Sequence, residues 1–113
     1  MPRRPKVSSG SLSRDEKPVA HKATWTFLSN HAHVLLLLAD DPELVMRDIA
    51  ARVGITERAV QRILGELERD GYITRSRVGR RNVYVVHEDR PLRHPIVAHR
   101  TVRELLGLVV VAG

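Results

Sequence analysis

The sequence contains no cysteine, and its aromatic residues are limited to one tryptophan, two tyrosines and one phenylalanine. The absence of cysteine excludes disulfides, thiolate metal ligands and cysteine nucleophiles, and it favours a reducing compartment. No apolar run approaches the roughly 20 residues that cross a bilayer, and the basic amino terminus lacks the apolar stretch of a secretory signal. We therefore predict a cytoplasmic protein that does not contact a membrane.

Sequence motifs of common catalytic sites are also missing. There is no glycine-rich phosphate loop, no Gly-x-Ser-x-Gly and no His-Glu-x-x-His. The adjacent carboxylates Asp40 and Asp41 precede a proline, as at an ordinary helix end. We predict no catalytic residue, no enzymatic activity and no cofactor.

Positive charge is unevenly distributed over the 113 residues, whose formal net charge is +6. Residues 1–22 hold six basic and two acidic residues with three prolines and four serines, which predicts a disordered basic arm. The remaining chain has 13 arginines and 11 acidic residues, so its overall charge is a weak argument for nucleic acid. Local clustering is stronger, because residues 75–81 hold four arginines and no acid.

Apolar spacing and breaker residues predict the order of the elements. Residues 24–39 lack glycine and proline and predict a buried first helix that ends at residues 40–42. Residues 44–46 fit a short strand or an extended lead, and residues 47–53 a short second helix. Gly54 is expected in the left-handed conformation at its end, and Thr56 as the N-cap of a third helix that Gly71 closes.

The rest of the chain predicts a hairpin and a final helix. Residues 72–77 and 82–86 are rich in strand formers and flank a loop at residues 78–81. Pro95 is suited to the first turn of a helix that reaches about residue 110. We predict a disordered arm at residues 1–22, a folded domain at residues 23–90 and a dimerisation helix within residues 91–113.

The order of helix, short helix, glycine turn, capped helix and arginine-bearing hairpin resembles that of winged helix-turn-helix proteins. Residues 47–64 and 67–73 are similar to the central stretch of small bacterial regulators of the MarR-like and ArsR-like kind, and the resemblance covers about residues 24–106. It implies an α+β fold whose third helix enters the DNA major groove. The hairpin, or wing, would touch the backbone or the minor groove.

Carried onto this sequence, the resemblance gives a set of DNA-binding residues. Arginine can read guanine and glutamine can read adenine in the major groove, while wing arginines would hold phosphates. Three alternatives remain: a solvated helix face, wing charges that only prevent edge-to-edge aggregation, and a winged helix that binds proteins. The predicted DNA-binding residues are Thr56, Glu57, Arg58, Gln61, Arg62, Arg75, Arg77, Arg80, Arg81 and Asn82.

A homodimer is expected because the last helix carries an apolar stripe at i, i+3, i+4 and i+7. The apolar first helix would supply the partner surface, although the stripe could instead pack within one chain. Any effector pocket would lie between the first helix, the third helix and this interface. The predicted interface residues are Val34, Leu35, Leu38, Val102, Leu105, Leu106 and Val109.

Histidines offer a metal-sensing alternative of the ArsR-like kind. His31 and His33 differ by two positions, and His94 and His99 by five, so neither pair chelates a metal within one helix. We predict no metal site and keep an inter-subunit site as the alternative. The predicted function is a homodimeric, sequence-specific binder of double-stranded DNA that regulates transcription, most often as a repressor.

Overall fold

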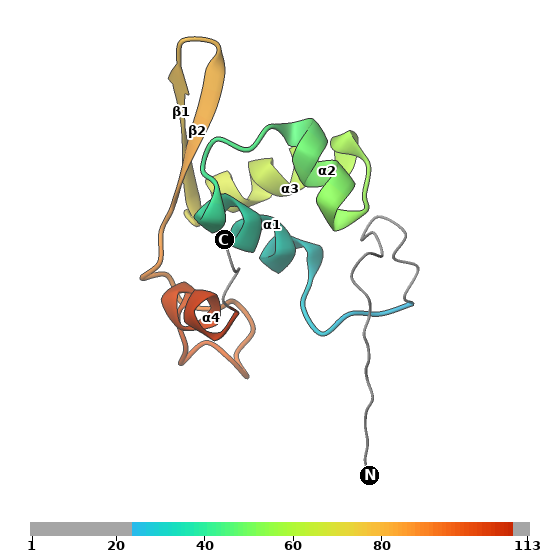
Figure 1. The fold of residues 1–113 in the computed structure, drawn as a ribbon. Helices are drawn as coiled ribbons and strands as arrows, with labels where there is room; N and C mark the ends of the chain where they lie inside the picture. The colour runs from blue at the N-terminus through green and yellow to red at the C-terminus, as the bar shows by residue number, and fades with distance from the viewer. Residues whose placement is uncertain (1–23, 110–113) are drawn as a thin grey trace.

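Residues 24–109 are described by the computed structural model, and they form four helices and one hairpin. The order is α1 (Asn30–Asp40), α2 (Met46–Val53), α3 (Glu57–Arg69), β1 (Ile73–Val78), β2 (Arg81–Val86) and α4 (Val102–Leu108). Helices α1 to α3 pack together, the hairpin projects from them, and α4 lies on the side away from the hairpin tip (Figure 1). This arrangement is the predicted α+β winged helix-turn-helix. None of the helices in this part of the chain is long and apolar enough to cross a membrane.

Helix α1 begins later than predicted. The Oγ of Ser29 accepts a hydrogen bond from the N–H of Ala32 at 3.2 Å, and Ser29 itself is extended, with φ −74° and ψ 167°. An N-cap of this kind fixes where a helix starts, whereas the mere absence of glycine and proline does not. The predicted helical start at Thr24 is therefore wrong, while the predicted end at residues 40–42 is confirmed.

The helix-turn-helix follows the predicted capping residues. Gly54 has φ 88°, a conformation that favours glycine, and the N–H groups of Gly54 and Ile55 both bond to the carbonyl of Ala50. Thr56 caps α3 by accepting from the N–H of Ala59 at 3.0 Å. Residues 44 and 45 form an extended lead into α2 rather than a strand, since Val45 is the extended N-cap, and α2 begins at Met46, one residue earlier than predicted.

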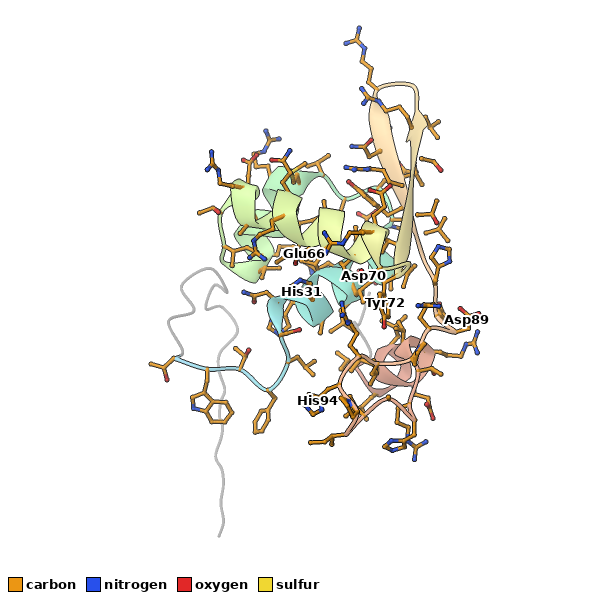
Figure 2. The ribbon with its side chains drawn as sticks, turned by 180° about the vertical axis from the view of Figure 1, so that it is seen from behind. His31, Glu66, Asp70, Tyr72, Asp89 and His94 are labelled. Carbon is orange, nitrogen blue, oxygen red and sulfur yellow. The ribbon has the colours of Figure 1, made fainter. Side chains whose placement is uncertain are left out.

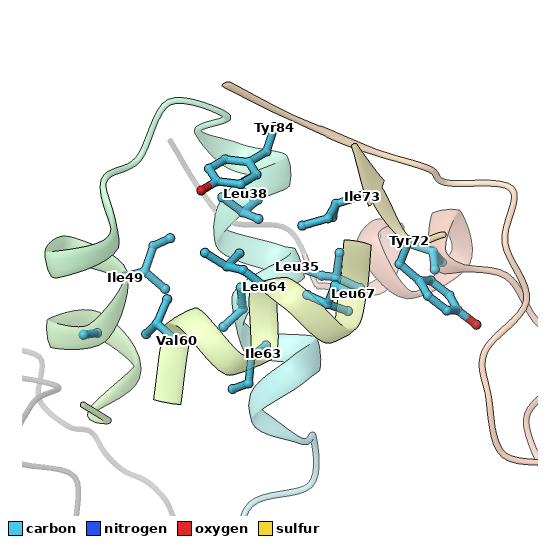
Figure 3. Close-up of a cluster of buried hydrophobic side chains, with 13 residues drawn as sticks. Leu35, Leu38, Ile49, Val60, Ile63, Leu64, Leu67, Tyr72, Ile73 and Tyr84 are labelled. Atoms are coloured by element: carbon cyan, nitrogen blue, oxygen red, sulfur yellow. The ribbon is translucent and has the colours of Figure 1, made fainter. Parts of the chain in front are cut away.

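One apolar cluster joins all these elements (Figure 3). Helix α3 contributes a stripe of Val60, Ile63, Leu64 and Leu67, each at most 5% exposed. The stripe recurs at three- and four-residue spacing, as predicted. The other members of the cluster are Val34, Leu35, Leu38, Ile49, Ala50, Tyr72, Ile73, Tyr84 and Val102.

The hairpin is tighter than predicted, because only Gly79 and Arg80 separate the last strand pair, Val78 and Arg81. Gly79 has φ 62° at the first turn position, as a type II′ turn requires. In the middle of β2, the N–H of Tyr84 bonds to the carbonyl of Pro42 at 2.9 Å. This bond ties the wing to the loop between α1 and α2.

The last helix is shorter than predicted and starts at a different residue. Pro95 opens no helix; residues 93–100 form bends and turns, and Thr101 is the N-cap of α4. Thr101 and Glu104 form a capping box, in which the side chain of each bonds to the backbone N–H of the other. Ile96, which lies within the predicted helix, is in a turn and is 75% exposed.

Four of the seven predicted interface residues belong to the core of the single chain. Val34, Leu35 and Leu38 are at most 6% exposed, and Val102 is 1% exposed. All four belong to the buried core cluster of the single chain, so they keep little surface for a partner. Leu105, Leu106 and Val109 are only partly buried and keep surface for a contact. The predicted arm at residues 1–22 lies outside the described residues.

Candidate nucleic-acid interface

The amino-terminal half of α3 presents polar side chains on the side opposite its buried stripe. Glu57, Arg58, Gln61 and Arg62 are all exposed. The hydroxyl oxygen of Thr56 caps the helix. A phosphate at this end would therefore be bound by the free backbone N–H groups of the first turn rather than by that hydroxyl. A capped helix held by four core residues is a rigid support for side chains that read base edges.

The two α3 arginines in this group differ in their surroundings. Arg62 lies 3.4 Å from Glu66, and Glu66 also bonds to His31 of α1 at 2.7 Å. Arg58 has no ion-pair partner among residues 24–109. Arg58 therefore presents its full charge and all its donors to a ligand, while Arg62 shares its charge with a carboxylate.

Strand pairing places the wing residues on two faces of the hairpin. Arg75 pairs opposite Tyr84 and Arg77 opposite Asn82, so these four residues share one face. Arg75 donates to Glu68 of α3 at 2.9 Å, which shows that this face is turned toward α3. Arg77 lies two residues closer to the tip and donates to the carbonyl of Gly79 at 3.4 Å. Arg77 and Asn82 thus continue the α3 side of the molecule.

The two remaining wing arginines lie at the turn. Arg81 lies on the opposite face and forms an ion pair with Glu43, in the loop between α1 and α2. Arg80 occupies the second position of the turn, is exposed, and has no ion-pair partner in the described part of the chain. The wing therefore carries one fully available arginine at its tip and two, Arg75 and Arg81, that carboxylates neutralise.

Two exposed arginines on α2 were not among the predicted site residues. Arg47 and Arg52 lie outside the buried pair Ile49 and Ala50, and neither has an ion-pair partner within residues 24–109. In a helix-turn-helix the first helix crosses the DNA backbone, so cations on its exposed face suit phosphates. Their spacing around the buried pair was visible in the sequence and could have identified them.

A pocket of about 400 Å³ lies at the other end of α3. Figure 2 shows His31 and Glu66 side by side, with Asp70 and Tyr72 at the same end of the helix. The hydrogen bond from His31, together with the nearby charge of Arg62, lowers the pKa of Glu66 below its ordinary value. No group of three His, Asp or Glu side chains suited to a metal occurs among residues 24–109. The pocket is lined by Ser29, His31, Ala32, Leu35, Glu66, Leu67, Arg69, Asp70, Tyr72, Leu92, Arg93, Val102 and Leu105.

Comparison with known families agrees with this geometry. Residues 30–74, from the start of α1 into β1, match the family described as winged helix-turn-helix DNA-binding. The fold is a winged helix-turn-helix. The match includes α2, the glycine turn and α3, and it supports a DNA-binding regulator of this class. No curated protein and no solved structure matches the chain.

Proposed function

We propose that the winged helix-turn-helix binds double-stranded DNA sequence-specifically as a homodimer and regulates transcription, as a repressor that blocks polymerase. The observation that carries this proposal is the exposed face of α3, where Arg58 and Gln61 stand opposite a buried stripe. The order of helix-turn-helix, wing and short final helix supports a place among MarR-like or ArsR-like regulators.

The proposed interface has two kinds of contact with DNA, to base edges and to phosphates. Arg58 and Gln61 would read base edges in the major groove, where a bidentate pair discriminates by about 1–3 kcal/mol. Arg47, Arg77 and Arg80 would hold phosphates, which position the protein without reading sequence. Glu57, Arg62 and Asn82 lie beside these groups, and Arg75 and Arg81 can contribute only by leaving their carboxylates.

The test begins with bound fragments of the source genome, selected with the purified chain and sequenced. Mobility shifts then compare a selected duplex with a random one for wild type, Arg58→Ala and Arg103→Ala. Arg103 lies on α4 beside Glu88, so its replacement removes the same charge away from the proposed interface. We expect Arg58→Ala to lower the preference for the selected duplex by about 5- to 150-fold, and Arg103→Ala to leave that preference unchanged.

Two results would overturn the proposal in different ways. Equal affinity of the wild type for selected and random duplexes would remove sequence specificity. Failure to bind any duplex at low salt would leave the winged helix as a protein-interaction module, the alternative that the sequence also allows.

A further inference from the structure

Two exposed aromatic side chains precede α1. Trp25 is 67% exposed and Phe27 is 91% exposed, and their rings pack edge to face with centroids 4.9 Å apart. Large aromatic side chains exposed together are uncommon on a chain with so few of them, and such patches mark contact surfaces. The two rings form what we call the aromatic knob, Trp25 with Phe27.

The pocket at the end of α3 begins two residues after the knob, since Ser29 is one of its lining residues. Its charged groups are already paired with each other: His31 with Glu66 at 2.7 Å, and Arg93 with Asp70 at 2.6 Å. Of its apolar lining residues, Leu92 and Leu105 are only partly buried and keep surface for an occupant, while Leu35, Leu67 and Tyr72 also belong to the buried core. An uncharged apolar or aromatic occupant fits this chemistry, and residues 24–28 contain no charged side chain.

We propose that the knob of one copy of this chain fills the pocket of a second copy, reciprocally, about a two-fold axis beside the start of α1. This rests on the homodimer of the proposed function and names the surface that forms it. In a two-fold contact each copy uses the same surface, so the knob and the pocket must lie next to each other on one copy, as they do here. The chain's own pocket does not take the knob, because Phe27 is 91% exposed within the single chain.

The two knobs would supply more than half of the area that a stable dimer needs. At the exposures of 67% and 91%, the two aromatic side chains of one copy present about 300 Å². Both knobs would therefore bury about 600 Å², and a specific interface needs about 1,000 Å² or more, so the pocket walls and neighbouring residues must add the rest. Leu105, one of the interface residues expected from the sequence, lines this pocket and would contact the partner.

The contact leaves the DNA-reading residues free. The pocket takes Glu66, Leu67, Arg69 and Asp70 from the end of α3, whereas Arg58 and Gln61 lie in its first turns. Dimerisation and DNA reading would thus use opposite ends of one helix.

The single tryptophan makes the proposal directly measurable. Trp25 is the only tryptophan in the chain, so its emission reports the knob alone. We expect the emission of the full-length protein, diluted from tens of micromolar to nanomolar without DNA, to shift from blue to red as sedimentation shows the mass falling from dimer to monomer. A dimer without this shift, a monomer at tens of micromolar, or an emission already blue in the monomer would each overturn the proposal.

A matched pair of variants locates the contact. Phe27→Ala should weaken dimerisation at least tenfold, while Ile96→Ala, which removes a side chain that is 75% exposed and outside the pocket lining, should not change it. Circular dichroism of both variants should remain that of the wild type, because neither side chain belongs to the core. Equal dissociation constants for the two variants would contradict the proposal.

Engineered cysteines identify which chain supplies the knob, since the natural sequence has none. A mixture of Phe27→Cys and Leu105→Cys copies should form a disulfide between chains under oxidation. If instead the double variant closes within one chain at nanomolar concentration, the occupant is the chain's own segment and the proposal is wrong. None of these measurements involves DNA. A monomer at tens of micromolar would remove the homodimer of the proposed function together with this surface, whereas a dimer without the knob contact would remove only this surface, and neither result would change the DNA-binding part of the proposal.

Discussion

The wing arginines show how a charge can be present in a sequence and yet be unavailable to a ligand. Arg81 is paired with Glu43, and Arg75 with Glu68, whereas Arg80 has no ion-pair partner among the described residues. A paired arginine that binds a phosphate must either leave its carboxylate or bring that carboxylate near the DNA, and both reduce the DNA affinity that the arginine adds. The four arginines of residues 75–81 are therefore not equivalent.

Replacing Glu43 by glutamine should strengthen DNA binding. The change frees Arg81 and removes a negative charge beside the wing, and since an exposed ion pair is worth about 0.2–1 kcal/mol, we expect a gain of about 1.4- to 5-fold in affinity. Glu88→Gln is the matched control, because it makes the same charge change beside Arg103 of α4. Mobility shifts at low salt on a random duplex measure both, and a gain no larger for Glu43→Gln than for Glu88→Gln would show that Arg81 takes no part.

Glu66 should make the stability of the folded chain depend on pH. Its hydrogen bond with His31 comes first, and the charge of Arg62 adds to it, so the pKa of Glu66 is held below its ordinary value of 4.5. A carboxylate whose pKa is lowered on folding stabilises the folded state above pH 4.5, and that stabilisation is lost as the pH falls through the lowered value. The difference in melting temperature between wild type and Glu66→Gln should therefore shrink between pH 6 and pH 3.

The control for this prediction is the same substitution in a His31→Ala background, which removes the largest cause of the shift. There, the effect of Glu66→Gln on the melting temperature should depend less on pH. An unchanged pH dependence in that background would assign the effect to Arg62 or another neighbour.

At the scale of elements, the parts that local chemistry determines could be predicted from the sequence. Gly54, Thr56 and the apolar spacing of α3 give the helix-turn-helix correctly, because a cap and a buried stripe are both written in nearby residues. The starts of α1 and α4 were wrong because several residues could begin each helix. The cap at Ser29 is identified by a hydrogen bond in the folded chain, whereas the Thr101-x-x-Glu104 spacing of a capping box was visible in the sequence and could have identified the start of α4.

The candidate site also has features that could be predicted from the sequence and features that could not. Exposure of Arg58 and Gln61 follows from helical periodicity, and it could be predicted. The pairing of Arg81 with Glu43 joins residues 38 positions apart, and the pairing of Arg75 with Glu68 depends on which hairpin face turns toward α3. Interface residues on α1 were misplaced since an apolar helix does not itself reveal whether its own chain or a partner covers it.

Helix α4 should depend on its cap more than the longer helices do. It has only seven residues, and its capping box satisfies N–H groups that the helix itself leaves open. Thr101→Ala should lower the free energy of unfolding by about 0.5–2 kcal/mol, measured by urea denaturation. Thr24→Ala, at an exposed residue outside any helix, is the matched control and should stay within about 0.5 kcal/mol of wild type. A cost no greater for Thr101→Ala would mean that α4 is held by Val102 rather than by its cap.

At the scale of the whole molecule, positive charge and apolar contact surface lie at different places. Among residues 24–109, five of the six arginines without an ion-pair partner belong to α2, the first turns of α3 and the wing: Arg47, Arg52, Arg58, Arg77 and Arg80. The sixth, Arg90, lies over the ring of Tyr72. The pocket belongs to the start of α1, the end of α3 and the segment that leads to α4. A dimer formed there would join two copies without covering either DNA-binding face.

Residues 1–22 extend this argument, because they hold six basic and two acidic residues, a net charge of +4, against +2 for the rest of the chain. Basic side chains that contact only phosphates release counterions from DNA of any sequence. The logarithm of the binding constant then falls with the logarithm of the salt concentration, with a slope of about 0.9 per phosphate neutralised. Deleting residues 1–22 should therefore lower affinity for a selected and a random duplex by a similar factor, and reduce the salt slope by about two to four units. Replacing Arg3, Arg4, Lys6 and Lys17 by glutamine at full length is the control, and should reproduce most of the loss. A loss confined to the selected duplex would instead show that this segment reads a groove.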